Sequence, residues 1–148
     1  MNHFVVTRSM MLQASPARVW DTLTNPAMTR RYMNDCAVSS DWLIGSPIRW
    51  NDDENRLRYK GDILEYEPGR KITYSCFDPR AGEDDHPSSY MHVSYVVVPR
   101  NGVTELLVTL SNFGDHDSRA EQAAENWDLE VLPKLKSLAE ERTMAIMH

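Results

Sequence analysis

The stretch 14-ASPARVWDTLTNPAMTRRYM-33 carries two helix-start signals in close succession. Ser15 is a favourable N-cap residue, and Pro16 suits a first helical turn, where a missing N–H costs nothing. Asn25-Pro26 repeats the same signal. We therefore expect a first short helix, a bend, and a second short helix that runs to about Tyr32.

The first of these helices has an apolar face made by Val19, Trp20 and Leu23, which follow helical spacing. We interpret Trp20 as a core residue that pins the helix to the rest of the fold. The alternative is that Trp20 forms part of a cavity wall.

Turn signals divide most of the remaining chain into β-like segments. Gly45-Ser46-Pro47 and Pro68-Gly69 are typical turn sequences, and Asn101-Gly102 is the strongest hairpin signal in the chain. Residues 78–89, DPRAGEDDHPSS, form a polar acidic segment that is longer than a simple hairpin loop, so we expect it to lie over an opening. The predicted strands are 3–12, 36–44, 47–51, 57–66, 71–77, 90–99 and 104–113.

The C-terminal part of the chain predicts one long helix. Ser118 and Glu121 have the spacing of a capping box. Pro133 lies within the helix and removes a backbone hydrogen bond, so we expect a kink near residues 129–133. The apolar stripe of this helix consists of Ala124, Trp127, Val131, Leu135 and Leu138.

These elements predict an α+β fold in one domain that spans residues 1–148. A seven-stranded, curved antiparallel sheet would be covered by the two short helices and the long C-terminal helix. A single helix does not fill the concavity of such a sheet, so we expect the sheet and the helix to enclose a cavity.

Composition narrows the classes of partner. The 148 residues carry a net charge of −6 with a pI near 5.3, which argues against nucleic acid and against an anionic membrane surface. Thr7, Arg8 and Ser9 interrupt the N-terminal apolar run, so we expect no signal peptide, and no segment is apolar enough to span a membrane. We interpret Cys36 and Cys76 as reduced thiols of a cytoplasmic protein.

Five segments together resemble the SRPBCC (START-like, helix-grip) superfamily, and the nearest branch looks like the family of homologues of the activator of the heat-shock-protein-ninety ATPase. The resemblance implies a seven-stranded sheet that grips a long C-terminal helix around an apolar cavity. Most small members of this kind are bacterial. The superfamily also contains cyclases and binders of lipids and hormones, so the resemblance implies no single function. The matching segments are ASPARVWDTLTNP, 40-SDWLIGSPIRW-50, 61-GDILEYEPGRKITYS-75, 93-VSYVVVPRNGVTELLVTLSNF-113 and 126-NWDLEVLPKLKSLAEE-141.

Aromatic side chains with polar tips follow the later strands and suit an apolar ligand held by a few hydrogen bonds. The alternative is ordinary packing between the sheet and the helix. His92 and Tyr95 have opposite parity in their strand, so they point inward together only if a bulge intervenes. The predicted ligand-binding residues are Trp50, Tyr74, Cys76, His92, Tyr95, Trp127 and Val131.

Motifs for enzymatic chemistry are missing from the sequence. There is no nucleophile elbow, P-loop or dinucleotide fingerprint, so we predict no catalytic residue and no cofactor. We interpret the acidic segments 83-EDDH-86 and 115-DHD-117 as solvated charge, because neither has the spacing of a zinc or calcium site.

The leading hypothesis is the binding of a small hydrophobic or aromatic molecule in the cavity between the sheet and the C-terminal helix. One alternative is an enzyme of the cyclase or hydrolase kind that uses polar cavity residues such as Tyr74, His92 or Tyr95. Another is a module that interacts with the chaperone, as the name of the family branch implies. The sequence leaves open whether the chain forms a homodimer.

Overall fold

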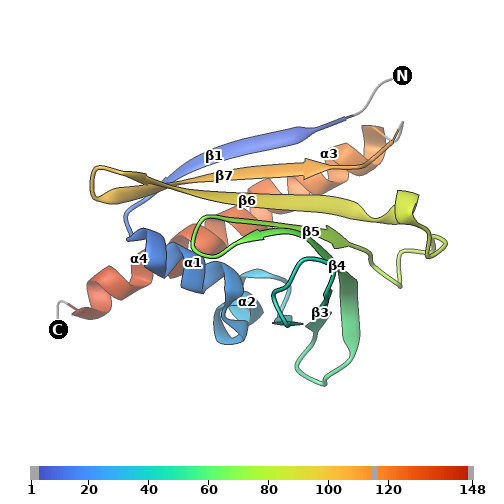
Figure 1. The fold of residues 1–148 in the computed structure, drawn as a ribbon, viewed down its shortest axis with the longest axis horizontal. Helices are drawn as coiled ribbons and strands as arrows, with labels where there is room; N and C mark the ends of the chain where they lie inside the picture. Colours follow the sequence, from blue (N-terminus) through green and yellow to red (C-terminus); the bar gives the residue numbers. More distant parts are fainter. Residues whose placement is uncertain (1–3, 115–116, 147–148) are drawn as a thin grey trace.

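A computed structural model describes residues 4–114 and 117–146 of the chain. Its strands are β1 (Val6–Leu12), β2 (Ala37–Ser40), β3 (Pro47–Asn51), β4 (Leu57–Glu67), β5 (Lys71–Cys76), β6 (Met91–Arg100) and β7 (Val103–Ser111). They form one sheet in the order β1-β7-β6-β5-β4-β3-β2, in which all neighbours are antiparallel. Figure 1 shows the helices gathered on one side of this sheet. The predicted α+β helix-grip architecture is therefore confirmed.

One predicted strand is too long. Residues 36–44 were expected to be extended, but β2 ends at Ser40. Trp42 has a φ of 58°, a left-handed conformation that an extended strand cannot contain. The chain then turns, and the Ser46 N–H donates to the Leu43 carbonyl at 2.9 Å.

The sheet bends because β4 contains an irregularity. Its register against β5 shifts between Ile63 and Glu65, so that Leu64 is an extra residue on this strand. A bulge of this kind increases the local twist and bends the strand. The result is a concave inner face, on which the helices pack.

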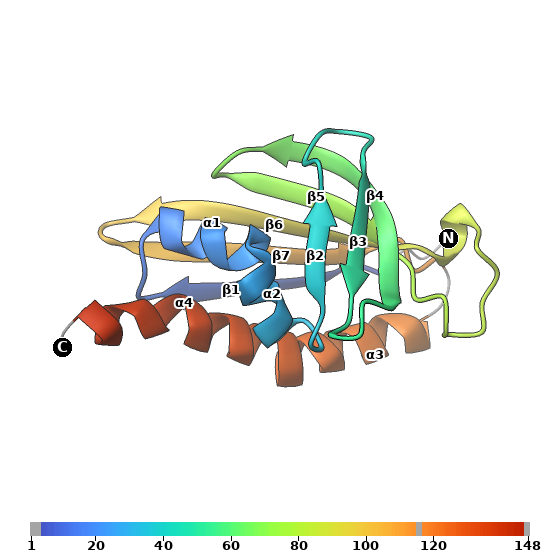
Figure 2. The same ribbon diagram turned by 90° about the horizontal axis from the view of Figure 1, so that it is seen from below.

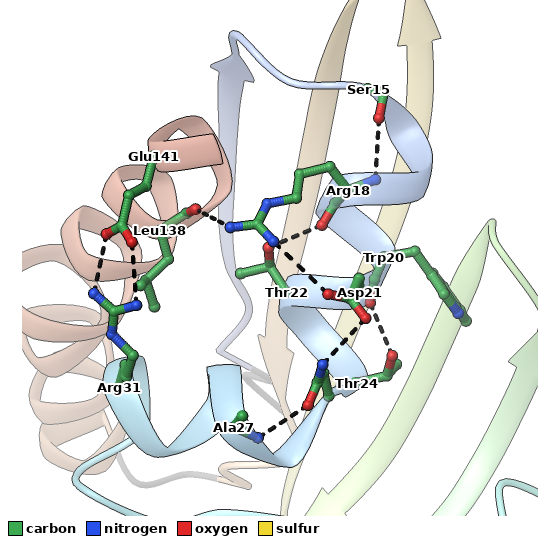
Figure 3. Close-up of polar contacts among 11 residues, drawn as sticks. Ser15, Arg18, Trp20, Asp21, Thr22, Thr24, Ala27, Arg31, Leu138 and Glu141 are labelled. Atoms are coloured by element: carbon green, nitrogen blue, oxygen red, sulfur yellow. Dashed lines mark hydrogen bonds and ion pairs between the residues drawn. The ribbon is translucent and has the colours of Figure 1, made fainter. Parts of the chain in front are cut away.

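The two short helices form as the sequence predicts, namely α1 (Pro16–Thr24) and α2 (Pro26–Tyr32). The Ser15 hydroxyl accepts a hydrogen bond from the Arg18 backbone N–H at 3.1 Å. The Asn25 side-chain oxygen accepts one from the Ala27 N–H at 3.0 Å. Figure 3 shows both caps, one at the start of each helix.

The face that α1 buries differs from the predicted one. Val19, Thr22 and Leu23 are buried, whereas Trp20 is only half-buried at the edge of this face. Its indole projects from α1 toward the neighbouring strands (Figure 3) and packs on Tyr66, with ring centroids 5.8 Å apart. Trp20 therefore anchors α1 from the flank of the helix rather than from its centre.

The long C-terminal helix has three parts, α3 (Asp117–Asn126), the π-helical turn η2 (Trp127–Val131) and α4 (Leu132–Ile146). In η2 the Leu132 N–H donates to the carbonyl of Trp127, five residues earlier. Pro133 follows and contributes no N–H. The sequence predicts a kink near residues 129–133, and the structure has this π turn in an overlapping position.

The predicted start of the helix needs a correction. Helix α3 begins at Asp117, so Ser118 lies within its first turn and is not the N-cap residue. Position 116, which precedes the helix, lies outside the described residues.

The core lies between the concave face of the sheet and α4. Figure 2 shows the long helix running along the sheet, with α1 and α2 beside α4. Helix α4 packs against α1, α2 and β1, whereas α3 packs chiefly against β7 and η2. Core side chains with no exposed surface include Leu12, Val19, Val93, Leu106, Leu110, Val131 and Leu135.

Candidate functional site

A pocket of about 350 Å³ opens at the α3 end of the concave face. Its wall comes from β4, the end of β5, residues 78–89, the start of β6, the segment after β7, and α3 together with Trp127. The volume is near the lower end of the roughly 300–1,000 Å³ that is usual for small-molecule sites. Residues 78–89 thus contribute to the rim of an opening, as expected from the sequence.

The inner part of the pocket is apolar. Phe77 follows directly after β5, and its ring stacks on Tyr90 with centroids 4.9 Å apart. Phe113, which follows β7, is buried, and Met91 opens β6. Together with Trp127 on the helix, these side chains form a surface suited to a flat or branched apolar molecule.

The rim is polar. Arg119 is the one cationic residue among the described residues that line the pocket. Its guanidinium donates to the Ser89 carbonyl at 3.2 Å and lies 3.6 Å from a carboxylate oxygen of Glu83. Asp78 and Gln122 add a carboxylate and an amide. A ligand with one polar end would therefore find hydrogen-bond partners at the rim and apolar contacts below it.

The structure places only two of the sequence-predicted ligand residues, Cys76 and Trp127, in the pocket wall. Trp127 is 3% exposed, and its indole N–H donates to the Tyr95 hydroxyl at 3.2 Å. Val131, one turn further along the helix, is fully buried. The helix therefore enters the site through Trp127, and the concavity beyond it is filled.

Trp50 and Tyr74 lie deeper on the same face, with ring centroids 5.6 Å apart, and both are buried. Within the described residues, neither the Trp50 indole N–H nor the Tyr74 hydroxyl has a hydrogen-bond partner. Leaving such a group unpaired costs about 1–3 kcal/mol. Their predicted role as ligand contacts, like that of Tyr95 and Val131, stays a prediction.

His92 does not join the other predicted residues. It alternates with the inward-pointing Val93 and Tyr95 and lies on the outer face of the sheet, in a separate cleft of about 310 Å³. This cleft also contains Asp62 and Tyr90. No bulge interrupts the pairing of β6 with β5 or β7, so the parity of the strand holds.

Burial shifts the pKa of several predicted ligand residues in the direction that favours their uncharged forms. It raises the pKa of Cys76 to about 12, with a smaller contribution from the Asp78 carboxylate. Burial likewise raises the pKa of Tyr74 and Tyr95 far above their ordinary value. Partial burial lowers the pKa of His92. At neutral pH the Cys76 thiol in the pocket wall is therefore uncharged, which suits neutral, apolar ligand groups.

Sequence reasoning missed most of the pocket wall, including Tyr59, Phe77, Met91, Phe113 and Arg119. These residues lie at or beyond the ends of strands and on the first turns of α3. One usable signal existed, because the long segment 78–89 and the predicted start of the last helix both border the same end of the meander.

Among residues 4–114 and 117–146, no cluster of three or more His, Cys, Asp or Glu side chains could hold a metal ion. The acidic segment 115–117 that the sequence singled out falls partly outside these residues. No helix in the same ranges is both long and apolar enough to cross a membrane.

A curved antiparallel sheet that grips a long helix, with a pocket at one end of that helix, defines a helix-grip protein. Residues 13–140 match the family model described as Activator of Hsp90 ATPase homolog 1-like protein, and the chain belongs to this family. A comparison with curated proteins finds no match.

Solved structures agree with this assignment. The solution structure of ChR145 from Cytophaga hutchinsonii is 26% identical, with 97% of this chain and 99% of that chain covered and a TM-score of 0.78. The Aha1 dimer from Colwellia psychrerythraea is 16% identical, covers 93% and 96%, and has a TM-score of 0.72. PFC0360w, an HSP90 activator from Plasmodium falciparum, is 14% identical, covers 90% and 94%, and has a TM-score of 0.71. At the two lower identities the likeness concerns the fold.

Proposed function

We propose that the chain binds a small, largely apolar molecule in the pocket at the α3 end of the sheet. The observation that carries the proposal is the composition of this pocket, which has an aromatic inner wall and a polar rim in a volume of about 350 Å³. Apolar surface that remains open inside a fold is stabilised when a ligand removes it from water, at about 25 cal/mol per Å².

The expected ligand has one polar end. Arg119, Asp78 and Gln122 lie at the rim, whereas Phe77 and Trp127 lie inside. A molecule bound in this pocket would direct its hydrogen-bonding group outward and its ring or branched chain toward Trp127. The two rim carboxylates and one guanidinium leave the charge of that group open.

A fluorescence titration with the neutral probe N-phenyl-1-naphthylamine tests the proposal. Ala123 is half-buried and lines the pocket, so Ala123→Phe fills the space without replacing a core side chain. We expect the wild type to bind the probe and the variant to lose at least about 10-fold in affinity. Ala17→Phe, on an exposed position of α1, is the matched control and should bind like the wild type.

Two results would contradict the proposal. One is the absence of probe binding together with no small molecule in native mass spectra of protein from its source. The other is equal binding by the wild type and by Ala123→Phe, which would place the probe elsewhere.

A second candidate is an interaction with the Hsp90 chaperone, supported by the family and by the fold shared with the Plasmodium HSP90 activator. It predicts that the purified chain stimulates the ATPase of an Hsp90 from the same source. An unchanged ATPase rate and no co-purification would remove this candidate. The dimeric Colwellia relative motivates a sedimentation measurement, which would decide whether this chain is a homodimer.

The enzymatic alternative depends on polar groups that converge in one cavity. Tyr74 and Tyr95 share the inner face, but His92 lies on the other side of the sheet. A reaction in the pocket would therefore have to use a group that lines it, such as Tyr59, Cys76, Asp78 or Glu83, for proton transfer or nucleophilic attack. The Cys76 thiol stays protonated.

A further inference from the structure

The long helix is held very unequally along its length. Helix α4 buries Leu132, Leu135 and Leu138, each at most 6% exposed, and it packs against three other elements. In α3 the apolar residues that face the fold are alanines, of which only Ala120 is buried among the described side chains. A buried leucine stabilises by about 1.5–3 kcal/mol and an alanine by much less. Apolar packing therefore fixes α4 firmly and α3 weakly.

The boundary between the two halves is the π turn η2. A π turn closes its hydrogen bonds over five residues and is a rare, local departure from the α-helix that is frequent at functional sites. Pro133 adds to the irregularity, because it offers no N–H to the carbonyl of Leu129, four residues earlier. The irregular hydrogen bonding of the helix therefore lies where its packing changes.

The two end residues of this turn are held in place. The Trp127 indole is buried and bonded to Tyr95, and Val131 is fully buried. Any movement of α3 relative to α4 would therefore turn about Trp127, at the inner end of the pocket.

The outer end of α3 is attached through Arg119. This side chain spans the rim, where its guanidinium donates to the Ser89 carbonyl and faces Glu83 at 3.6 Å, a longer separation than most ion pairs in the chain. Glu83 and Ser89 belong to the segment that borders the pocket. That segment is itself tied to the sheet, because Asp85 accepts from Lys60 at 2.5 Å and from the Tyr90 hydroxyl at 2.6 Å.

We propose that α3 is a hinged lid over the pocket. The π turn η2 is its hinge, and Arg119 is the latch that holds the lid closed. Residues 78–89 stay in place, because Asp85 holds them to the sheet, and α3 is the part that moves. Arg119, Gln122 and Ala123 all lie on α3 and line the pocket, so opening the lid removes one wall and admits a ligand. The role of the lid in admitting a ligand rests on the proposed ligand-binding function. The structural evidence for its movement does not.

Amide hydrogen exchange, measured by NMR on the ligand-free protein, tests directly whether α3 opens as a lid. Residues 122–126 of α3 are compared with residues 135–139 of α4, which avoids the first helical turn and its unpaired N–H groups. We expect the α3 amides to exchange at least about 10-fold faster, because they open locally rather than with the whole fold.

Two substitutions locate the latch and the hinge. Glu83→Gln weakens the latch and should speed α3 exchange by about 3-fold while α4 stays unchanged. Pro133→Ala restores a helical N–H and should slow α3 exchange. Glu125→Gln, an exposed position on α3 outside the pocket wall, is the control and should change neither.

Stopped-flow binding of N-phenyl-1-naphthylamine adds the functional readout. For Pro133→Ala, whose site lies outside the pocket wall, we expect the association and dissociation rate constants to fall together by about 3-fold, with little change in Kd, because a gate alters access rather than affinity. Equal protection of α3 and α4 from amide exchange, or a uniform effect of Glu83→Gln on both, would overturn the proposed lid even if the probe binds. Absence of probe binding together with faster α3 exchange would overturn the proposed function, but it would still support the lid.

Discussion

The indole N–H of Trp127 donates a hydrogen bond to the hydroxyl of Tyr95 at 3.2 Å, and both side chains are almost completely buried. This bond joins the centre of the long helix to the middle of β6. It also marks the limit of the pocket, since Trp127 lines the pocket and Tyr95 does not. The open and the filled parts of the concavity meet at this pair.

Removing both partners should destabilise the protein by less than the sum of the two single effects. Trp127→Phe and Tyr95→Phe each leave one buried polar group unpaired, at about 1–3 kcal/mol, and Trp127→Phe also loses packing. Urea unfolding of the wild type, both single variants and the double variant gives the coupling energy, which we expect to be about 1 kcal/mol. Strict additivity of the two single effects would show that the bond contributes nothing to stability.

The cap of α1 should be measurable on its own. Ser15→Ala removes the acceptor of the Arg18 N–H and should lower the free energy of unfolding by about 1 kcal/mol, whereas Ser15→Gly should cost only a few tenths. Ser137→Ala, at an exposed position inside α4, is the control and should change stability by less than about 0.5 kcal/mol. Chemical denaturation compares them, and an equal effect of both alanine substitutions would speak against the cap.

Gly61 allows β4 and β5 to approach closely. A Cβ atom at this position would lie 1.7 Å from the Ser75 carbonyl oxygen, so the backbone would have to move. We expect Gly61→Ala to lower the free energy of unfolding by about 3 kcal/mol or more. Gly69→Asn is the comparison, since Gly69 has open space around it and asparagine tolerates its φ of 79°. Thermal unfolding that shows a wild-type midpoint for Gly61→Ala would mean that the strands are further apart.

The Cys76 thiol should resist alkylation. Its pKa is raised from 9.0 to about 12, so at pH 8 the thiolate fraction is lower than in an ordinary cysteine by roughly three powers of ten. Iodoacetamide labelling followed by mass spectrometry should leave Cys76 unmodified in the native protein. The same reagent in guanidinium chloride should modify both cysteines, and rapid native labelling at Cys76 would contradict its burial.

Acid should weaken the attachment of α4 to the N-terminal region. Burial alone would raise the pKa of Glu140, but the Gln13 N–H at 2.7 Å and the Lys136 ammonium lower it below 4.5. Because the folded pKa is depressed, this contribution is complete above pH 4.5 and is lost as the pH falls through the folded value.

Glu140→Gln should therefore reduce stability at pH 7 by about 0.5–1 kcal/mol and have little effect near pH 3. Unfolding midpoints measured between pH 3 and pH 7 test this, with Glu125→Gln as the exposed control. A constant difference between wild type and Glu140→Gln across this range would show that the carboxylate charge is not involved.

Local turn and helix-capping signals in the sequence predicted most of the helices and strands. Ser15-Pro16 and Asn25-Pro26 both cap helices, and Asn101-Gly102 forms the turn between β6 and β7. These signals work because caps and turns satisfy backbone groups within a few residues. The end of β2 escaped prediction, because nothing in the residue type of Trp42 indicates its left-handed conformation, in which its N–H donates to the Ser40 hydroxyl at 3.0 Å.

The candidate site was predicted less well. Parity along β6 correctly separates His92 from Tyr95, and helical spacing places Trp127 toward the sheet. Neither pattern says whether an inward-pointing side chain meets another side chain or open space. That depends on how far the sheet curves and how the helix is set across it, both of which involve residues far apart in the sequence.

The sequence by itself determined the order of the strands and helices, the caps of α1 and α2, and the inward-facing positions of β6 and the long helix, because backbone hydrogen bonding and hydrophobic periodicity act over short distances. Only the tertiary structure decided that the space around Trp50, Tyr74 and Tyr95 is filled, that the opening lies near Phe77 and Arg119, and that the long helix divides at a π turn. These features follow from side-chain volumes meeting across the curved sheet, where close packing leaves space only at positions that no single segment specifies.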